Sequence, residues 1–444
     1  MLGTEGIGRL LVRLSVPATV AMLAHALYNL VDTIFIGRGV GTEAIGGLTI
    51  AFPFQILVMA FAIMIGFGAA SVVSRNLGSG NRERASIAAG NAIGISIVFG
   101  LLVTLFGYLF IDPILMLFGA TPLLVGYARD YLSVVLSGTV FITFAMATNS
   151  IVRAEGRATV AMAAMVLGTV ANIILDPVFI FGLKMGIKGA ALATVISQFL
   201  SFAFLLNFFA NRRSPRASSL KIRLHHLKPD GSVLREEFAL GVPAFVRQAG
   251  FSIILILVNN SLGRYGGDIY ISVFGLVFRI LHFVLLPLMG LVQGFQPITG
   301  YNFGAGNISR VKRTVVLSIT VSSILATLGF LFLVLFPGLV FSIFSNDSEL
   351  ITAGKPVLRV IILVIPLIGI QMIGSTYFQA VGKAKPALFL GLTRQFIFLL
   401  PFMIVLPLVF GLWGVFAAFP AADFLSTVVT GFWLVKDVRS LRAS

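Results

Sequence analysis

Long apolar stretches separated by short polar segments make up nearly the whole chain. The mean hydropathy is +1.03, and 58% of the 444 residues are apolar while 11% are charged, against about 25% charged in a soluble domain. No window alternates polar and apolar residues as a barrel strand does, so the stretches are predicted to be membrane-spanning helices. We predict twelve, at about residues 10–36, 45–74, 86–111, 125–152, 158–181, 187–211, 234–262, 269–299, 311–336, 352–380, 385–410 and 412–435.

The chain divides into two similar halves. Asn76-Leu77-Gly78-Ser79-Gly80-Asn81 returns 226 residues later as Asn302-Phe303-Gly304-Ala305-Gly306-Asn307. The same offset pairs Pro17 with Pro243, Gly37-Arg38 with Gly263-Arg264, and Gly156-Arg157-Ala158 with Gly382-Lys383-Ala384. We therefore predict an all-α integral membrane protein. Six helices form an N-lobe (1–211), a basic linker follows (212–233), and six helices form a C-lobe (234–444), with a pseudo-two-fold axis and a central cavity between the lobes.

Basic residues concentrate in alternate loops. Of the 32 Lys and Arg residues, 22 fall in the two end segments and every second loop, 7 fall in the other loops, and Arg247, Arg279 and Arg394 fall inside predicted helices. By the positive-inside rule this bias places both termini in the cytoplasm. The net charge of +16 is thereby explained by membrane topology, and we expect no nucleic-acid partner. We expect a multi-pass monomer in a prokaryotic cytoplasmic membrane.

Several kinds of chemistry are excluded or disfavoured by the composition. The chain contains no cysteine, which rules out disulfides and thiolate metal sites. The four histidines, His25, His225, His226 and His282, are too scattered for a zinc site. HExxH, GxSxG and the phosphate-binding GxxxxGK[ST] pattern do not occur. We expect neither an enzyme nor ATP coupling, and no organic cofactor.

Three acidic residues fall well inside predicted helices, namely Asp32, Asp176 and Asp423. A carboxylate at the centre of a bilayer costs about 2.5–3.5 kcal/mol on insertion scales, so each one needs a partner or a function. Asp32 and Asp176 lie on the first and fifth helices, and we interpret them as ion-coupling residues of a transporter. Asp423 lies on the last helix.

Other polar side chains share helical faces with these two carboxylates. Asn172 lies one turn before Asp176, and Gln198 lies one turn after Thr194. His25, Tyr28 and Asp32 form one stripe on the first helix. Tyr131 and Asn149 are 18 residues apart on the fourth helix, about five turns, which places them on the same face. Bonding to a neighbouring helix is the plainer role for Tyr131, Asn149, Thr194 and His25.

The repeat provides an internal control for this polar cluster. Adding 226 maps Asp32 to Val258, Asp176 to Phe402, Asn172 to Phe398, His25 to Phe251, Tyr131 to Val357, Asn149 to Ser375 and Thr194 to Pro420. The second half keeps the prolines and glycines and replaces most of the polar side chains by apolar ones. The cluster is therefore predicted to serve function, and ion coupling is placed in the first half.

These features together resemble the MATE family of multidrug and toxin extruders, in its prokaryotic DinF-like branch. The resemblance rests on Pro17, Asp32 and Gly37-Arg38, on the two Asn-x-Gly-x-Gly-Asn turns, on Arg153-Ala154-Glu155-Gly156 and on Asn172 to Pro177. It implies an antiporter that exports lipophilic, often cationic drugs or toxins in exchange for H⁺ or Na⁺. It also implies that the first helix bends at Pro17 when Asp32 is neutralised.

The donor atoms fit a small hard cation. Carboxylate, amide and hydroxyl oxygens of Asp32, Asn172, Asp176 and Thr194 suit Na⁺, while a proton needs only a carboxylate in a suitable environment. His25, Tyr28, Tyr131, Asn149 and Gln198 are assigned to support of this site or to the drug cavity.

Basic and amide side chains stand on the second-half helices instead of acids. In related branches, acidic residues on helices seven and ten bind the cation, but here those helices carry Arg247, Gln248, Asn259, Asn260, Gln371 and Gln379. Arg247, Arg279 and Arg394 are expected to snorkel to headgroups, to pair with Asp423 or to line the cavity. They also support the alternative function, a flippase for lipids or lipid-linked saccharides.

Overall fold

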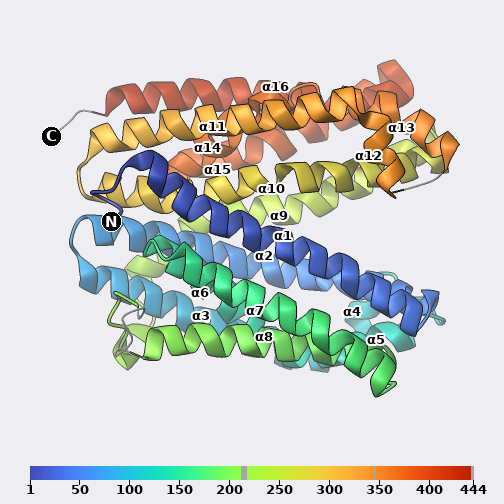
Figure 1. The fold of residues 1–444 in the computed structure, drawn as a ribbon, viewed down its shortest axis with the longest axis horizontal. Coiled ribbons are helices and arrows are strands. Elements are labelled where there is room, and N and C mark those ends of the chain that lie inside the picture. The colour runs from blue at the N-terminus through green and yellow to red at the C-terminus, as the bar shows by residue number, and fades with distance from the viewer. Residues whose placement is uncertain (212–217, 345–346, 442–444) are drawn as a thin grey trace. The chain divides into compact units, whose positions relative to one another are not determined.

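The computed structural model describes residues 1–211, 218–344 and 347–441, and these residues form helices and turns without any strand. The α-helices are α1 (Ile7–Gly39), α2 (Thr42–Gly78), α3 (Arg82–Leu109), α4 (Ile111–Leu117), α5 (Val125–Ser137), α6 (Thr139–Ala154), α7 (Ala158–Pro177), α8 (Gly186–Ala210), α9 (Gly231–Tyr265), α10 (Asp268–Gly304), α11 (Ile308–Leu335), α12 (Pro337–Phe344), α13 (Ser348–Ile361), α14 (Ile368–Ala380), α15 (Ala384–Leu392) and α16 (Leu400–Ser440) (Figure 1). Short π-helical turns follow α7 (η1, Val178–Gly182) and α15 (η4, Thr393–Leu399).

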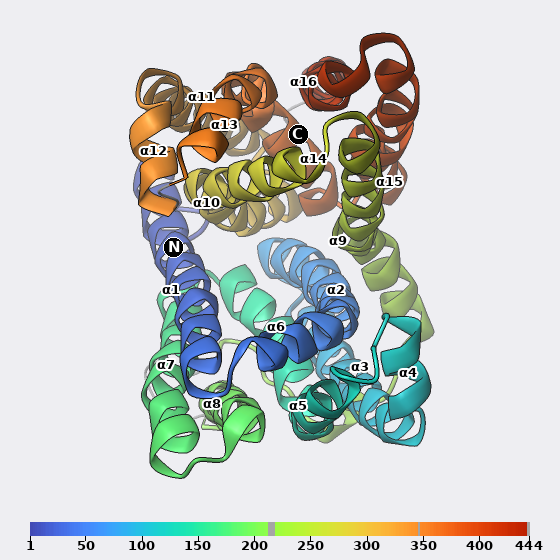
Figure 2. The ribbon, with the colours of Figure 1, turned by 90° about the vertical axis from the view of Figure 1, so that its right-hand side faces the viewer.

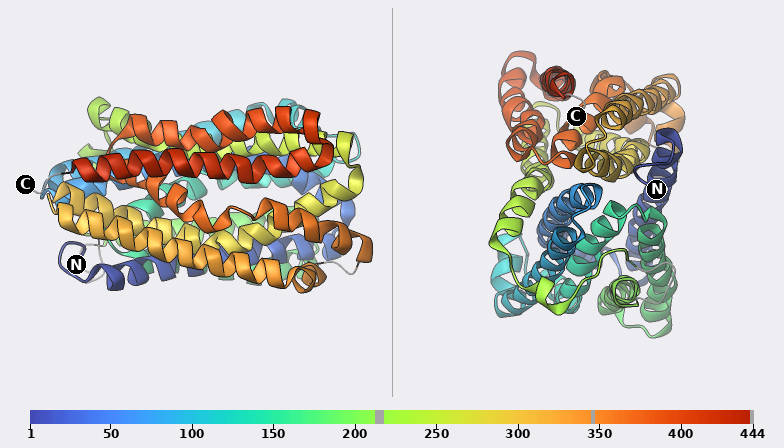
Figure 3. Two further views of the ribbon diagram at one scale, coloured as in Figure 1. Left: turned by 90° about the horizontal axis from the view of Figure 1, so that it is seen from above. Right: turned by 90° about the vertical axis from the view of Figure 1, so that its left-hand side faces the viewer.

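The described helices account for twelve membrane crossings. Nine are long and apolar enough to span a bilayer, and two bent pairs, α5 with α6 and α13 with α14, raise the total to 11. One of these, Ala384–Ser440, has 57 residues, or about 85 Å of helix against a hydrocarbon layer of about 30 Å. It is interrupted at Gly411, whose φ of 55° is not helical, and the red segment that contains α16 turns back on itself (Figure 3). Counting it twice gives the predicted twelve.

The fourth predicted helix is broken. α5 and α6 meet at Gly138 with a bend of 56°, and Gly138 packs against Gln198, where an added Cβ would lie 2.7 Å from the side-chain oxygen. The expectation that Tyr131 and Asn149 share one face of a straight helix is therefore wrong. The bend leaves Tyr131 on α5 and turns Asn149 toward α7, where its amide donates to the carbonyl of Ala161 at 2.8 Å.

The chain forms two compact units that do not coincide with contiguous halves. Unit 2 comprises Val20–Gly241, and unit 1 comprises Met1–Thr19 with Val242–Ser444. The boundaries fall beside the repeated prolines, Pro17 in α1 and Pro243 in α9. The first turns of α1 thus belong to the unit made from the second half, and the first turns of α9 to the unit made from the first half.

Within unit 2, the first turns of α9 pack closely on α2. An added Cβ at Gly68 would lie 2.0 Å from the backbone oxygen of Glu237, and one at Gly241 would lie 2.1 Å from that of Met64. Such close approach of small residues is how helices gain packing energy where lipid removes most of the hydrophobic driving force. α7 and α8 lie side by side in the same unit (Figure 2).

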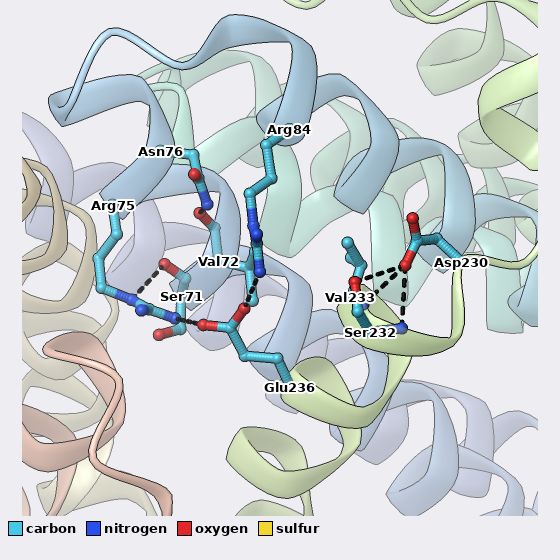
Figure 4. Close-up of polar contacts among 9 residues, drawn as sticks. All are labelled: Ser71, Val72, Arg75, Asn76, Arg84, Asp230, Ser232, Val233 and Glu236. Atoms are coloured by element: carbon cyan, nitrogen blue, oxygen red, sulfur yellow. Dashed lines mark hydrogen bonds and ion pairs between the residues drawn. The ribbon is translucent and has the colours of Figure 1, made fainter.

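An ion-pair network at the end of α2 fixes the same turns of α9. Glu236 accepts from Arg75 at 2.8 Å and from Arg84 at 3.0 Å (Figure 4). Just before α9, the Asp230 carboxylate accepts from the hydroxyl and N–H of Ser232 and from the N–H of Val233. These hydrogen bonds lower the pKa of Asp230, and the one from the Ser232 hydroxyl has the largest effect. They also satisfy donors at the helix start.

Unit 1 holds the first turns of α1 in the equivalent way. An added Cβ at Gly294, which is Gly68 plus 226, would lie 2.3 Å from the hydroxyl of Ser15. Arg310, which is Arg84 plus 226, donates to the carbonyls of Leu2 at 3.3 Å and Glu5 at 2.6 Å. Arg84 and Arg310, at equivalent places after the repeated turns, therefore have one task, carried out once in each unit.

The described part of the linker, residues 218–230, is bonded to unit 2. Glu155 accepts from the hydroxyls of Ser218 and Ser219 and from the N–H of Ser219, and burial raises the pKa of its carboxyl. Asn91 donates to the carbonyls of His226 and Lys228. Arg212, Arg213 and Arg216, which the sequence assigns to this linker, and Arg442 lie outside the described residues.

Candidate functional site

Asp32 and Asp176 meet inside unit 2. Asp32 is 6% exposed and Asp176 is fully buried, and their side chains lie within hydrogen-bonding reach of one another. The Oδ1 atom of each carboxyl has no hydrogen-bond partner among the described residues. α1 and α7 thus bring together the two acids that the sequence singled out, with two oxygens left unsatisfied.

Asn172 and Thr194 complete one side of this pair. With its amide orientation assigned from the hydrogen-bond network, Asn172 donates to Oδ2 of Asp176 at 2.9 Å and accepts from the N–H of Thr194 at 3.2 Å. Asn172 and Thr194 are both buried. The helix spacing of 172 and 176 on α7 explains the contact, because residues four apart lie one turn from each other.

Two tyrosines and one unpredicted glutamine surround the acids. The hydroxyls of Tyr28 and Tyr131 both reach the side chain of Thr194, and Tyr131 also reaches Gln55 on α2. The side-chain nitrogen of Gln55 is buried without a partner among the described residues. Gln55 was missed by the sequence analysis, although the repeat control would have found it, since adding 226 maps it to Leu281.

The remaining sequence-predicted residues lie at different distances from the acid pair. His25 packs against Tyr28 with ring centroids 5.4 Å apart, so it extends the stripe on α1. Gln198 lies at the bend between α5 and α6. Asn149 hydrogen-bonds α6 to α7 and also accepts a hydrogen bond from Arg153. This is the helix-bonding role that the sequence analysis considered for it. Pro17 belongs to unit 1.

The linker brings two histidines onto an acid at the start of α3. Nε2 of His226 lies 2.8 Å from Glu83, and Nε2 of His225 lies 3.7 Å from the same oxygen. The histidines were predicted to be too scattered for a zinc site, but His225 and His226 come close enough to Glu83 for the three side chains to hold a metal ion. Nδ1 of His226 accepts from the N–H of Arg223, so the ring proton lies on Nε2 and is donated to Glu83. These side chains therefore join the linker to the start of α3 by hydrogen bonds.

Unit 1 contains a buried polar cluster of its own. Arg394 on η4 forms an ion pair with Asp423 on α16, as one of the sequence-based alternatives expected. Gln371 on α14 donates to the hydroxyl of Ser426 at 2.6 Å, and Ser426 contacts Thr393 at 3.2 Å. Arg247 on α9 donates to the hydroxyl of Ser375 at 3.2 Å, and Arg279 is exposed.

Twelve crossings in two repeated halves are the architecture of two-lobe membrane transporters. The chain is a member of the MatE family, whose model matches it twice, over residues 17–178 and 243–405. The two matches begin at Pro17 and Pro243, 226 residues apart, which confirms the internal repeat.

Relatives and solved structures agree with this assignment over the whole chain. The multidrug export protein MepA of Staphylococcus haemolyticus (strain JCSC1435) is 28% identical over 439 residues, covering 99% of this chain and 94% of the relative. The solved structure of the MATE multidrug transporter DinF-BH in complex with R6G is 44% identical, with a TM-score of 0.91 over 99% of this chain and 98% of that one. A crystal structure of MATE in complex with MaL6 is 26% identical, with a TM-score of 0.93 over 100% and 99% of the two chains.

Proposed function

We propose that this chain is a secondary active multidrug efflux antiporter of the cell membrane. It exports lipophilic, often cationic compounds in exchange for H⁺ or Na⁺, and Asp32 and Asp176 are the coupling residues. Support comes from family membership, from relatives named as multidrug export proteins, and from the acid pair in unit 2.

The contact between two buried carboxyl groups carries the proposal. Two ionised carboxylates at hydrogen-bonding distance repel each other strongly in a medium of low dielectric constant. The arrangement is stable when a proton neutralises one of them or when a cation lies between them. The two unsatisfied Oδ1 atoms are the positions at which either would bind.

The surrounding side chains suit both coupling ions. The side-chain oxygens of Asp32, Asp176 and Thr194 are hard donors for Na⁺, and Asn172, which accepts from one side and donates to Asp176, holds that carboxylate in place. A proton alone would give the pair a joint titration. Because the bound cation changes the charge of unit 2, it changes which conformation is favoured, and the drug competes for the other conformation.

Pro17 supplies the hinge in this proposal. A proline inside a helix removes one backbone hydrogen bond, and Pro17 stands beside the point in α1 at which unit 1 gives way to unit 2. Neutralising Asp32, fifteen residues further along the same helix, favours bending there. The protein works as a monomer with both termini in the cytoplasm.

The test is efflux of a fluorescent lipophilic cation from proteoliposomes, driven by a pH gradient alone or by a Na⁺ gradient alone. Wild type, Asp32→Asn and Asp176→Asn are compared. We expect one gradient to drive efflux in wild type, and both variants to lose the dependence on that gradient while remaining folded.

Asp130→Asn is the matched control, since Asp130 is an acid of the same unit that is half exposed and paired with Lys188 at 3.1 Å. It should keep full coupling. Efflux that is still gradient-driven in both buried variants would refute the coupling role of the pair. A wild type that moves no drug under either gradient would refute the antiporter and point to lipid translocation.

A further inference from the structure

Glu83, His225 and His226 form a cluster of donor atoms where the linker meets the start of α3. Glu83 stands in the first turn of α3, and the two histidines belong to the linker turn η2 (Leu224–Leu227). One ligand atom from each side chain lies within 4.8 Å of the other two. Within residues 1–211, 218–344 and 347–441, no second group of three His, Cys, Asp or Glu side chains comes this close.

Backbone contacts hold the linker on α3 independently of the cluster. Asn91 donates to the carbonyls of His226 at 2.9 Å and Lys228 at 3.1 Å, and it accepts from the N–H of Asp230 at 2.7 Å. Gly90 lets the linker approach closely, since an added Cβ would lie 2.5 Å from the carbonyl oxygen of His226. The main chain therefore places the two imidazoles beside the acid, and their side chains can exchange hydrogen bonds for other bonds without moving the linker away.

The repeat shows that the fold does not require this cluster. Adding 226 maps Glu83 to Ser309, Gly90 to Val316 and Asn91 to Leu317, so unit 1 begins the equivalent helix, α11, without these residues. Glu83 also has no Lys or Arg partner among the described residues, because the neighbouring arginine, Arg84, pairs with Glu236. Its carboxylate faces the two imidazoles alone.

The donor set is that of a transition metal. Two histidines and one glutamate are three protein ligands of a known zinc type, with water as the fourth ligand. Zinc bonds of about 2.0–2.1 Å put the donor atoms of a tetrahedral site about 3.3 Å apart. Here Oε1 of Glu83 lies 2.8 Å from Nε2 of His226 and 3.7 Å from Nε2 of His225. The Glu83 and His225 side chains are 69% and 57% exposed, so a hydrated ion can reach them.

We infer that Glu83, His225 and His226 bind one Zn²⁺ ion, which ties the linker to α3. In the structure Nδ1 of His226 accepts from the N–H of Arg223 at 3.1 Å, and Nε2 carries the ring proton. Coordination through Nε2 moves that proton to Nδ1 and breaks the bond from Arg223. Zn²⁺ thus replaces this bond and the one between His226 and Glu83. We therefore expect a lower affinity than that of a structural zinc site.

Zinc binding is measured by isothermal titration calorimetry on the detergent-solubilised full chain, purified without a histidine tag. We expect one Zn²⁺ per chain, and an excess of Mg²⁺, which prefers oxygen ligands, should leave the titration unchanged. Glu83→Gln and His225→Ala should each weaken binding about tenfold or more. Both side chains are exposed, and the contacts of Asn91 with the linker remain, so both variants should keep the apparent Tm of wild type when Zn²⁺ is left out.

Glu349→Gln and His282→Ala are the matched controls, because both side chains are exposed and both belong to unit 1. They should bind Zn²⁺ as wild type does. The apparent Tm gives a second readout: Zn²⁺ should raise it in wild type and in the controls, and less in Glu83→Gln and His225→Ala. Absence of binding in wild type, wild-type affinity in both cluster variants, or equal weakening in the controls would overturn the site. Since no drug is transported in these measurements, their outcome is independent of the proposed function.

Discussion

The two units share one helical scaffold but balance their buried charges differently. In unit 2 two acids, Asp32 and Asp176, contact each other without a basic partner. In unit 1 the charges are arginines, one neutralised by Asp423 and one, Arg247, bonded to a hydroxyl alone. The docking of the first turns of α1 and α9, by contrast, uses equivalent residues in both units.

The difference separates what the fold needs from what function needs. Residues that hold the helices against one another are the same in both halves of the repeat, as Gly68 with Gly294 and Arg84 with Arg310 show. Positions that carry buried charge are not kept. An unpaired buried charge in one unit that becomes an apolar residue in the other is therefore a candidate for ligand binding, whereas a paired one, such as Asp423, serves stability.

The largest effect should come from neutralising the acid pair. Asp32→Asn or Asp176→Asn is expected to lower gradient-driven efflux about a hundredfold, which corresponds to about 2.7 kcal/mol. Neither variant should lower thermal stability, because each relieves repulsion between like charges. Transport in proteoliposomes and the apparent Tm in detergent are measured on the same preparations. If efflux and the apparent Tm fell together, the acid pair would have a structural role, and the proposed difference between the units would be wrong.

The next effect concerns Asp423, where the contrast predicts the opposite behaviour. Asp423→Asn leaves Arg394 without its partner, and we expect a loss of about 2–3 kcal/mol of stability. This is less than the cost of about 3–5 kcal/mol for a fully buried pair, because the Arg394 side chain is 35% exposed. Unfolding of Asp423→Asn, Arg394→Gln and the double variant provides the check, with the double variant expected to recover part of the loss. Additive losses would contradict the pairing.

Gln55 provides a sharper test of the site, with its own repeat equivalent as control. Gln55→Leu should weaken the apparent affinity for the coupling ion about tenfold, or about 1.4 kcal/mol, because it removes an amide beside Tyr131. Leu281→Gln introduces the same side chain at the equivalent place in unit 1 and should leave the ion dependence unchanged. The half-saturating ion concentration for efflux is the measurement. A shift in the control alone would mean that unit 1 also contributes to coupling.

The smallest difference between the two units should appear where their residues are alike. Gly68→Ala is expected to cost about 1–3 kcal/mol, since the added Cβ would lie 2.0 Å from a backbone oxygen of Glu237. Gly294→Ala should cost less, because the nearest atom, at 2.3 Å, is the hydroxyl of Ser15, which can rotate away. The apparent Tm values of the two variants show which substitution costs more stability. A greater loss at Gly294 would show that the two docking sites are held differently.

The scaffold was predictable because its signals are local or repeated. The lengths of the apolar stretches predicted the membrane crossings, and the constant offset between matching motifs predicted the repeat. The bend between α5 and α6 was not, because it arises where Gly138 packs against Gln198, a contact between distant residues. The same bend separates Tyr131 from Asn149 and invalidates a spacing argument made for a straight helix.

The acid pair was predictable and the arginine cluster only partly so. Asp32 and Asp176 stand out because carboxylates are rare inside apolar helices. The polar cluster of unit 1 would have emerged from the repeat control run in reverse, since subtracting 226 maps Gln371 to Ala145, Arg394 to Gly168 and Arg247 to Ala21. Which arginine has an acid beside it depends on the packing of η4 against α16, and no spacing in the sequence shows that.

The assignment of residues 1–19 to unit 1 also sets an order of events during synthesis. These residues are made first, yet Asn302 and Arg310, which bond to them, are made after the first eight crossings. Unit 2 has its full sequence once Gly241 has been added, so it can fold while the rest is still being translated. A ribosome that stops after residue 241 would therefore release a complete unit 2 carrying, at its N-terminus, a segment whose binding site was never made.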